Sequence, residues 1–480
     1  MTLFSGEDAA RWCHSVWSPQ PPRRITGVST DTRALASGHL FVALHGPRFD
    51  GHDFVPAAFE RGACGAVVRR GFAWCVSSEH ALLFVDDPGR ALQDLGAGYR
   101  AALAPEIVAV TGSAGKTTVK EMAADLLDTL APTARTRGNW NNEIGIPLSL
   151  LAMQPSHKIG VFEVGVSHPG EMASLGRMLK PSWVIVTNVG PVHLEFLETE
   201  EGVAREKGQL LRELGTDGTA ILPGDSPWFP FLRSAVAGRV VTVAMTGEAD
   251  YVCRETRCLA DGGTAVLVEE ARQAAVREEI YVPVPGRHNV RNALLAVALA
   301  REHGVAWDAI RSALRRYRPL PMRWESQVVA GVVVVNDAYN ANPMSMRAAI
   351  ETFERMRVEG RRWLVLGSML ELGRGEEEEH LALGRHLATG PWAGLIVVGP
   401  LGTRIARGAQ AAGMAEERIM CCGTPAEAAE VLATRAAAGD AVLLKASRSI
   451  HLEQTIECWT RRVAEGSAET AGRSNRRGAP

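Results

Sequence analysis

Hydrophobic positions in the first hundred residues fall in short runs broken by polar and turn-forming residues. Two such runs are HLFVAL (39–44) and CGAVVRR (64–70), and glycine, proline and aspartate lie between them. Short apolar runs bounded by turn residues are typical of strands in a small mixed domain. The pattern therefore predicts a small N-terminal α/β domain over residues 1–104.

A second pattern begins after Ala104 and Pro105, because a residue before proline disfavours continuation of a helix. The apolar runs EIVAV (106–110), IGVFEV (159–164) and WVIVT (183–187) follow, separated by stretches with helical spacing. Continuous apolar strands that alternate with helices predict a mostly parallel sheet covered on both faces. We expect this central domain to span residues 105–318.

A third α/β pattern follows the Pro-Leu-Pro segment at 319–321, which we interpret as a linker. Its strands are expected at VVVVN (332–336), WLVLG (363–367), LIVVG (395–399) and AVLLK (441–445). Four such alternations predict a doubly wound, Rossmann-like sheet over residues 319–465. Residues 466–480 contain almost no apolar side chains, so we expect a disordered tail there.

Composition narrows the class of protein without naming a function. The chain has 480 residues, about three domains at roughly 150 residues each, and 46% hydrophobic with 22% charged residues is ordinary for a globular protein. Lys and Arg total 52 against 54 Asp and Glu, which gives a net charge of −2. This balance provides no basic surface for nucleic acid or an anionic membrane, so any polyanionic ligand needs a local site.

Cysteine usage and the N-terminus indicate the compartment. The eight cysteines include no CxxC pair, and the N-terminus lacks the basic and apolar regions of a signal peptide. No run reaches the roughly 18 apolar residues of a spanning helix. We therefore expect a cytoplasmic protein with reduced thiols and no membrane insertion.

The strongest chemical signal is TGSAGKTTVKEM (111–122), which lies between the strand at 106–110 and a predicted helix. In a phosphate-binding loop, glycines let successive N–H groups face phosphate oxygens, a lysine reaches the terminal phosphates and a Thr hydroxyl binds Mg²⁺. The spacing is GxxGK[ST], shorter than the common GxxxxGK[ST], and a plain glycine-rich turn is the alternative. The predicted nucleotide loop consists of Thr111, Gly112, Ser113, Ala114, Gly115, Lys116, Thr117 and Thr118.

Two further residues follow apolar strands and belong at the same sheet edge. Glu163 ends the strand at 159–164 and suits a Mg²⁺ ligand, although a solvated strand end is the alternative. His193 follows the strand at 183–187 and is a candidate metal ligand as a neutral imidazole. A single histidine after a strand is more often structural.

Several motifs, in this order, resemble the Mur ligase family from about residue 25 to 453. They are GSAGKTTVKEM (112–122), GNWNNEIGIPLSLL (138–151), FEVGVSHPGEM (162–172), TNVGPVHLE (187–195), EKGQLL (206–211), GRHNVRNALLA (286–296), NDAYNANPMSMRAAI (336–350), LGSMLELG (366–373) and VLLKASRSIHLE (442–453). The opening segment at 29–55 and DAYNANPMSM resemble the member that completes the peptidoglycan pentapeptide. The resemblance implies a three-domain Mur ligase architecture, with the UDP-substrate domain first, a P-loop ATPase domain in the centre and a closing domain last.

The implied activity is ATP-dependent amide formation, with Mg²⁺ and an acyl-phosphate intermediate. The substrates would be UDP-N-acetylmuramoyl-tripeptide and D-alanyl-D-alanine, and we expect a monomer. Phosphorylation gives a carboxylate a good leaving group, and phosphoryl transfer depends mainly on positioning and charge neutralisation.

By motif position, the resemblance also assigns roles to individual residues. Thr117 and Glu163 match ligands of one Mg²⁺, His193 a ligand of a second, and Lys207 a lysine carried as a carbamate. A carbamate would attract Mg²⁺, whereas an ammonium near a pKa of about 10.4 would repel it. Lys116, His193 and Lys207 are thus the implied catalytic set. Asn289, Arg323 and Asp337 match ATP contacts, although Asn289 is also a possible helix N-cap.

Substrate contacts are implied in the same way. The motif positions for the UDP substrate are Ser29, Asp31, Thr32, Arg33, Asn139, Asn141 and Asn142. Those for the incoming dipeptide are Tyr339, Asn340, Asn342, Lys445 and Arg448. Ordinary turn chemistry is the alternative for the Ser, Asp and Asn residues, and helix capping for Lys445 and Arg448.

Two positions depart from the family pattern. Ser368 stands where the pattern has an acidic residue, and Ser167 where Asn is usual. Ser368 leaves open an inactive paralogue that only binds the precursor. The other rivals are a P-loop NTPase that switches partner binding and two sibling ligases, one that adds the third peptide residue and a folylpolyglutamate synthetase, and the DTR and DAYNANP motifs argue against both siblings.

Overall fold

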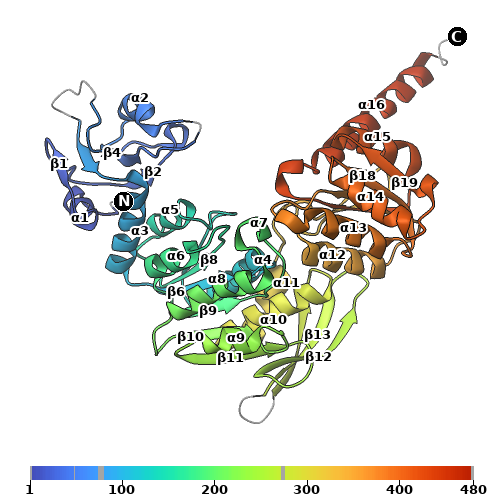
Figure 1. The fold of residues 1–480 in the computed structure, drawn as a ribbon, viewed down its shortest axis with the longest axis horizontal. Coiled ribbons are helices and arrows are strands. Elements are labelled where there is room, and N and C mark those ends of the chain that lie inside the picture. Colours follow the sequence, from blue (N-terminus) through green and yellow to red (C-terminus); the bar gives the residue numbers. More distant parts are fainter. Residues whose placement is uncertain (1–2, 48, 74–79, 272–275, 477–480) are drawn as a thin grey trace.

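A computed structural model shows three α/β domains arranged in a bent row, with the central domain at the bend (Figure 1). The structure describes residues 3–47, 49–73, 80–271 and 276–476. Each domain is built on its own sheet, of five, nine and six strands in chain order. In the part of the chain that is described, no helix is both long and apolar enough to cross a membrane.

The N-terminal domain has strand order β1-β5-β4-β3-β2, parallel except for the β1–β5 pair. Its elements are α1 (Gly6–Trp12), β1 (Val16–Ser18), β2 (Gly27–Ser29), η1 (Thr32–Ala34), β3 (His39–Val42), η2 (Gly51–Phe54), α2 (Val55–Glu60), β4 (Gly65–Arg69), β5 (Leu82–Val85) and α3 (Pro88–Leu103). Helix α3 ends at Leu103. The next residue, Ala104, is the C-cap in a left-handed conformation with a φ of 49°, and Pro105 follows it. The helix stop expected at this proline is therefore confirmed.

The central sheet has the order β14-β13-β12-β11-β10-β9-β6-β8-β7. Its elements are β6 (Glu106–Thr111), α4 (Lys116–Leu127), β7 (Thr133–Arg135), α5 (Gly145–Leu151), β8 (Ile159–Glu163), α6 (Glu171–Leu179), β9 (Trp183–Val186), α7 (Leu194–Leu197), α8 (Glu200–Arg212), β10 (Thr219–Pro223), α9 (Phe229–Ser234), β11 (Arg239–Ala244), β12 (Tyr251–Cys258), β13 (Thr264–Glu270), β14 (Val276–Val282), α10 (Arg287–Glu302) and α11 (Trp307–Arg316). In the order of the sheet, neighbouring strands from β7 at one edge as far as β12 pair in parallel. Beyond β12, the strands β13 and β14 pair antiparallel and extend the sheet.

Burial on both faces explains why the central strands are almost wholly apolar. Val108 and Val110 of β6 pack in the core formed with α4, α10 and α11. Ile107 and Ala109, which point to the other face, pack in the core formed with α3, α5, α6 and α8. A parallel sheet covered by helices on both sides needs apolar residues in both alternating positions.

The C-terminal domain has strand order β15-β16-β20-β17-β18-β19, parallel except for the β15–β16 pair. Its elements are β15 (Glu325–Val329), β16 (Val332–Asn336), α12 (Pro343–Arg355), β17 (Arg362–Gly367), η3 (Gly373–Gly375), α13 (Glu376–Leu387), β18 (Trp392–Val398), α14 (Gly402–Ala411), η4 (Glu416–Arg418), β19 (Ile419–Cys422), α15 (Pro425–Arg435), β20 (Ala441–Lys445), η5 (Arg448–Ile450) and α16 (Gln454–Arg476). Helices α12, α13 and α14 cover one face, and α15 and α16 the other. The predicted doubly wound sheet is therefore present.

The C-terminal end differs from the sequence expectation. Helix α16 runs from Gln454 to Arg476 and projects from the domain (Figure 1), so it extends through most of the expected disordered tail. The segment has no proline before residue 480, so the helical backbone hydrogen bonds can continue beyond the packed part of the helix. Residues 477–480 lie outside the described residues.

Candidate active site

The loop between β6 and α4 has the geometry of a phosphate-binding loop. Gly112 and Gly115 have φ values of 149° and 79°, which side-chain-bearing residues rarely adopt. A Cβ at Gly112 would lie 1.9 Å from Thr187 Oγ1, and one at Gly115 would lie 2.5 Å from Asn292 Oδ1. Both glycines are therefore required, and they bring the chain to the N-terminus of α4 at Lys116.

The segment after β9 holds this loop through hydrogen bonds. Asn188 accepts a hydrogen bond from the Ala114 N–H (2.9 Å) and donates one to the Ala114 carbonyl (3.0 Å). The Ser113 N–H also donates to the Asn188 carbonyl, at 3.1 Å. Sequence reasoning did not assign Asn188, although the TNVGPVHLE motif contains it.

The position of β6 in the sheet brings three predicted residues together. β6 lies between β8 and β9, so the chain crosses over in opposite directions from this point. Ligands in open α/β sheets bind at such a switch point, beyond the carboxyl ends of the strands. Glu163 at the end of β8 and His193 after β9 flank the loop that carries Lys116.

A hydroxyl and a carboxylate meet beside the loop. Thr117 Oγ1 donates to Glu163 Oε2 at 2.7 Å, and Asn141 Nδ2 donates to Glu163 Oε1 at 2.7 Å. Glu163 is only 2% exposed, so the alternative of a solvated strand end does not hold. Arg323 from the third domain donates to Thr117 Oγ1 at 2.8 Å.

These two oxygens fit the donor set that Mg²⁺ prefers. Thr117 and Glu163 provide oxygen ligands at the phosphate loop, and Mg²⁺ commonly combines one or two such protein groups with phosphate and water oxygens. Within the described ranges, no group of three or more His, Cys, Asp or Glu side chains could hold a metal by itself. Phosphate and water oxygens would complete the ligand set of a metal held by Thr117 and Glu163.

Two lysines lie near the phosphate loop, and Lys116 lines the cleft whereas Lys207 does not. Lys116 Nζ donates to the Gly112 carbonyl at 2.8 Å, and burial lowers its pKa. Lys207 lies on α8, is 3% exposed, and does not line the cleft. Burial and, less strongly, the charge of Lys116 lower the pKa of Lys207 to about 7, while Glu206 acts in the opposite sense. A substantial fraction of Lys207 is therefore neutral near pH 7.

His193 contacts the third domain. Its Nδ1 is hydrogen-bonded to Glu371, and Ser167 Oγ lies 3.5 Å from the same nitrogen. The Glu195 N–H also donates to the Glu371 carbonyl, at 3.1 Å. Glu371 was not assigned from the sequence, although LGSMLELG contains it.

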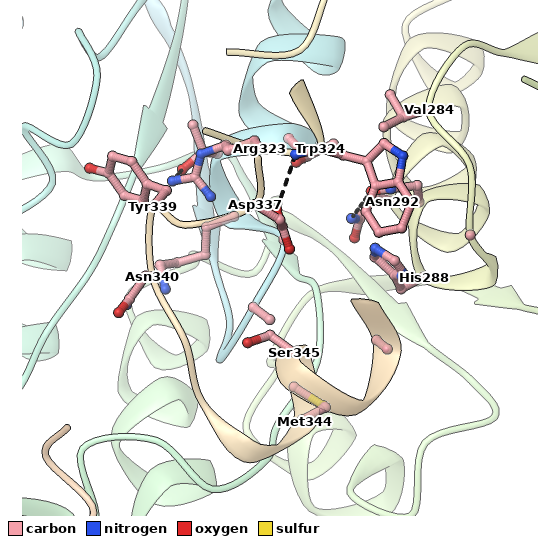
Figure 2. Close-up of a pocket in the computed structure, with 18 of the residues that line it drawn as sticks. Val284, His288, Asn292, Arg323, Trp324, Asp337, Tyr339, Asn340, Met344 and Ser345 are labelled. Atoms are coloured by element: carbon pink, nitrogen blue, oxygen red, sulfur yellow. Dashed lines mark hydrogen bonds between the residues drawn. The ribbon is translucent and has the colours of Figure 1, made fainter. Parts of the chain in front are cut away.

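The third domain places an arginine against the phosphate loop. The Arg323 guanidinium lies over the Tyr339 ring, 4.1 Å from its centroid (Figure 2). Nearby, Asp337 accepts hydrogen bonds from the Trp324 N–H (3.1 Å) and from Lys445 Nζ (2.6 Å). Asp337 and Lys445, which sequence reasoning assigned to different ligands, thus form an ion pair.

The asparagines after β16 make hydrogen bonds with the backbone around them and with Lys445. Asn342 is the N-cap of α12, because its side chain accepts from the Ser345 N–H, and its Nδ2 donates to the Ser113 carbonyl at 3.2 Å. The Asn340 carbonyl accepts from Lys445. Domain three therefore touches the phosphate loop through α12 as well as through Arg323.

A second group of side chains faces the cleft from α10. Figure 2 shows His288 and Asn292 of α10, and Val284 from the segment before it, in the part of the cleft that also holds the Trp324 ring. Burial lowers the pKa of His288 to about 4, so its imidazole is neutral at physiological pH. The N-cap of α10 is Gly286, so the N-cap alternative for Asn289 is wrong, and Asn289 instead donates to the Pro285 carbonyl at 2.8 Å.

The predicted residues of the N-terminal domain lie elsewhere. Asp31 caps η1 and forms an ion pair with Arg33, Ser29 Oγ donates to the Asp31 carbonyl, and the Thr32 carbonyl accepts from Arg61. This is the turn chemistry that the sequence left as an alternative.

The cleft between the central and third domains has a volume of about 1780 Å³. Sequence-predicted residues on its wall are Ser113, Ala114, Gly115, Lys116, Thr117, Thr118, Asn139, Asn141, Asn142, Glu163, His193, Asn289, Arg323, Asp337, Tyr339, Asn340, Asn342, Lys445 and Arg448. Predicted residues that do not line it are Thr111, Gly112, Lys207, Ser29, Asp31, Thr32 and Arg33. The phosphate loop, the proposed metal ligands apart from Lys207, and the third-domain residues therefore share one cavity.

Models of known protein families match segments of all three domains of this chain. Family models match as the Mur ligase catalytic domain at residues 24–126, the Mur ligase middle domain at 110–300, and the Mur ligase glutamate ligase domain at 322–448. The UDP-N-acetylmuramoyl-tripeptide–D-alanyl-D-alanine ligase of Bacillus subtilis is 35% identical over 90% of this chain and 93% of its own. The Escherichia coli enzyme of that name is 36% identical over 75% and 78%.

Solved structures agree. A crystal structure of MurF from Acinetobacter baumannii superposes with a TM-score of 0.86, at 30% identity over 96% of this chain and all of that chain. MurF ligase from Thermotoga maritima, solved in complex with ADP, superposes with a TM-score of 0.80, at 28% identity over 92% and 98%.

Proposed function

The chain belongs to the Mur ligase family, and we propose that it is the ATP-dependent ligase that joins D-alanyl-D-alanine to UDP-N-acetylmuramoyl-tripeptide. The observation that carries this proposal is the single cleft in which the phosphate loop meets Arg323 and Asn342 of the third domain. The names of the relatives supply the substrates, and the ADP complex of the Thermotoga maritima enzyme supports ATP as the nucleotide.

The proposed reaction has two steps. A terminal carboxylate oxygen of the tripeptide attacks the γ-phosphorus of ATP, ADP leaves, and an acyl phosphate forms. The amine of D-alanyl-D-alanine then attacks the acyl carbon, the carbon–oxygen bond to phosphate breaks, and the amine loses a proton as the amide forms. The products are the UDP-linked pentapeptide, ADP and phosphate.

Residues on both sides of the cleft suit the first step. Lys116 and Arg323 converge on Thr117 and the phosphate loop, so they provide positive charge where the γ-phosphoryl group transfers. Asp337, which accepts a hydrogen bond from the Trp324 N–H, and Asn289 line the same cleft, and we assign them to the nucleoside end of ATP. The contacts from the third domain also limit access of water to a hydrolysable intermediate.

Mg²⁺ is the proposed metal. Thr117 and Glu163 would hold one ion, and His193, with Lys207 as a carbamate, a second. When bound, the ions would neutralise charge on the phosphate oxygens. The neutral amine that burial favours at Lys207 is the form that adds to carbon dioxide, which supports the carbamate assignment.

Substrate contacts follow the domains. We assign the UDP end of the substrate to Ser29, Asp31, Thr32 and Arg33, and the peptide near the phosphate loop to Asn139, Asn141 and Asn142. The incoming dipeptide is assigned to Tyr339, Asn340, Asn342, Lys445 and Arg448. Lys445 and Arg448 already have the partners Asp337 and Glu453, so they are the members that must rearrange to meet a carboxylate. We further propose that the protein works in the cytoplasm as a monomer.

The test offers the purified protein ATP, Mg²⁺, the UDP-linked tripeptide and D-alanyl-D-alanine, and follows phosphate release together with product mass. The proposal predicts one amide per phosphate released. Phosphate without amide would indicate an NTPase. Amide formation only with a single amino acid in place of the dipeptide would indicate one of the sibling ligases, and no turnover would indicate an inactive paralogue.

A further inference from the structure

Lys120 is a charged residue that none of the roles above uses. It lies one helical turn after Lys116 on α4, and its side chain is fully buried at 0% exposure. A buried ammonium group is costly unless it is paired and fully hydrogen-bonded. Its partners therefore indicate what the residue does.

Two of its three partners belong to one chain segment. Lys120 Nζ donates to the carbonyl of Thr136 at 2.8 Å and contacts that of Gly138 at 3.5 Å, and it forms an ion pair with Glu121 Oε1 at 2.6 Å. An ammonium group has three N–H donors, so these three acceptors account for all of them. The two carbonyls lie in residues 136–142, between β7 and α5, which we call the asparagine loop because it carries Asn139, Asn141 and Asn142.

The asparagine loop is joined to the metal-ligand candidate. The Glu163 N–H donates to Thr136 Oγ1 at 3.1 Å, and Asn141 Nδ2 donates to Glu163 Oε1 at 2.7 Å. The Asn141 carbonyl accepts from the Gly165 N–H at 2.9 Å. The loop is thus tied to β8 and the residues after it at Thr136 and at Asn141, and Lys120 also ties its start to α4.

Charge balance alone does not explain Lys120. Arg135 pairs with the same Glu121 at 2.9 Å and with Asp125 at 2.7 Å, so the carboxylate of Glu121 has a second cation. Among the described side chains of α4, Lys120 is the one bonded to the loop carbonyls. Two backbone bonds close within the loop, from Trp140 N–H to Arg137 and from Asn141 N–H to Asn139, and the Thr136 N–H donates to the Val161 carbonyl at 3.3 Å.

We infer that Lys120 is a positioning residue, which holds the asparagine loop so that Asn141 meets Glu163 and Asn139 and Asn142 face the cleft. The identity of the substrate that these asparagines meet, the UDP-linked tripeptide, rests on the proposed function. The positioning itself does not. Lys120 connects the helix that carries the phosphate loop to the segment that would receive the second substrate.

Hydrogen exchange tests the positioning without any assumption about substrate. Lys120→Met removes the donors and keeps a side chain of similar length, and Arg135→Met is the matched control because it removes the neighbouring cation of the same cluster. We expect backbone amides at 137–144 to exchange at least tenfold faster in Lys120→Met and to stay within threefold of the parent in Arg135→Met. Unchanged exchange at 137–144 overturns the inference. If Lys120→Met unfolds, Lys120→Met/Glu121→Gln, which removes both charges of the Lys120–Glu121 pair, is judged by the same criterion.

Kinetics of the same variants test the route through Asn141. Lys120→Met should raise KM for the UDP-linked tripeptide at least tenfold and leave KM for ATP within threefold. In an Asn141→Ala background the same change should add less than threefold, because residues that act through one contact are not additive. If the increases in KM caused by Lys120→Met and by Asn141→Ala multiply in the double variant, Lys120 does not act through Asn141 and this part of the inference is overturned. If the parent makes no amide, the proposed function fails, and the exchange measurement still decides the role of Lys120.

Discussion

Arg323 provides the sharpest test of how the third domain completes the site. In Arg323→Met the guanidinium loses its hydrogen bond to Thr117 Oγ1, 2.8 Å long, and its position over the Tyr339 ring. A hydrogen bond to a charged group contributes about 1.5–3 kcal/mol, and a cation–π contact about 0.5–2 kcal/mol. A loss of about 2–5 kcal/mol corresponds to roughly a 30- to 4,000-fold lower kcat/KM for ATP, at about 1.4 kcal/mol per factor of ten.

The assay is phosphate release under steady-state conditions with both other substrates saturating. Arg318→Met is the matched control, because Arg318 lies five residues before Arg323, is exposed, and donates to the backbone carbonyls of Arg315 and Tyr317. Its kcat/KM should stay within threefold of the parent. A value for Arg323→Met that also stays within threefold would refute the argument that Arg323 acts at the phosphate loop.

Three further predictions concern single residues. Lys116→Ala should reduce phosphate release by about 10²- to 10³-fold, because it removes a cation at the transferring group, and release at the parent's rate would defeat the phosphate-loop assignment. Lys207→Ala should lose activity and regain part of it with added short carboxylic acids, and absence of rescue at every concentration would count against the carbamate. Burial raises the pKa of Cys13 to about 12 and that of Cys64 to about 11, whereas Cys258 is exposed. Iodoacetamide at pH 7.5 should therefore alkylate Cys258 before Cys13 and Cys64, as mass spectrometry of digests would show, and equal labelling of Cys13 would contradict this.

The strands that the sequence predicts well are those buried on both faces. β6, β8, β16 and β20 are runs of apolar residues, and each lies where its run does, because burial on both sides of a parallel sheet leaves no room for another pattern. The phosphate loop was equally readable, since its glycines are fixed by steric contacts that no other residue satisfies.

The antiparallel extension β12–β14 is less readable because its strands carry many charged residues. Arg254 and Arg277 both pair with Glu269 across the ribbon, so the polar face that hides the strands from a search for apolar runs is part of their pairing. α16 was underestimated for a related reason. The composition of a segment indicates whether it can bury apolar surface. A helix that projects from a domain buries little apolar surface, so the low apolar content of residues 466–480 did not indicate the helix.

The site residues also divide into those that could be predicted from the sequence and those that could not. Residues at strand ends, such as Glu163 and Asp337, could be placed at the cleft from the sequence because parallel strands share one edge. Contacts made by separate domains could not. The pairing of His193 with Glu371, and of Asn342 with the Ser113 carbonyl, depends on how the third domain approaches the central one, and no local pattern encodes that approach.

Isotope transfer tests the acyl-phosphate ligation most directly. The UDP-linked tripeptide is prepared with ¹⁸O in its terminal carboxylate and turned over with ATP, Mg²⁺ and D-alanyl-D-alanine, and the released phosphate is analysed by mass spectrometry. Attack of the carboxylate on ATP followed by amide formation places one carboxylate oxygen in the phosphate, so we predict one ¹⁸O per phosphate and an equal amount of pentapeptide product. Phosphate free of ¹⁸O would show that ATP is hydrolysed by water and would contradict the proposed ligase.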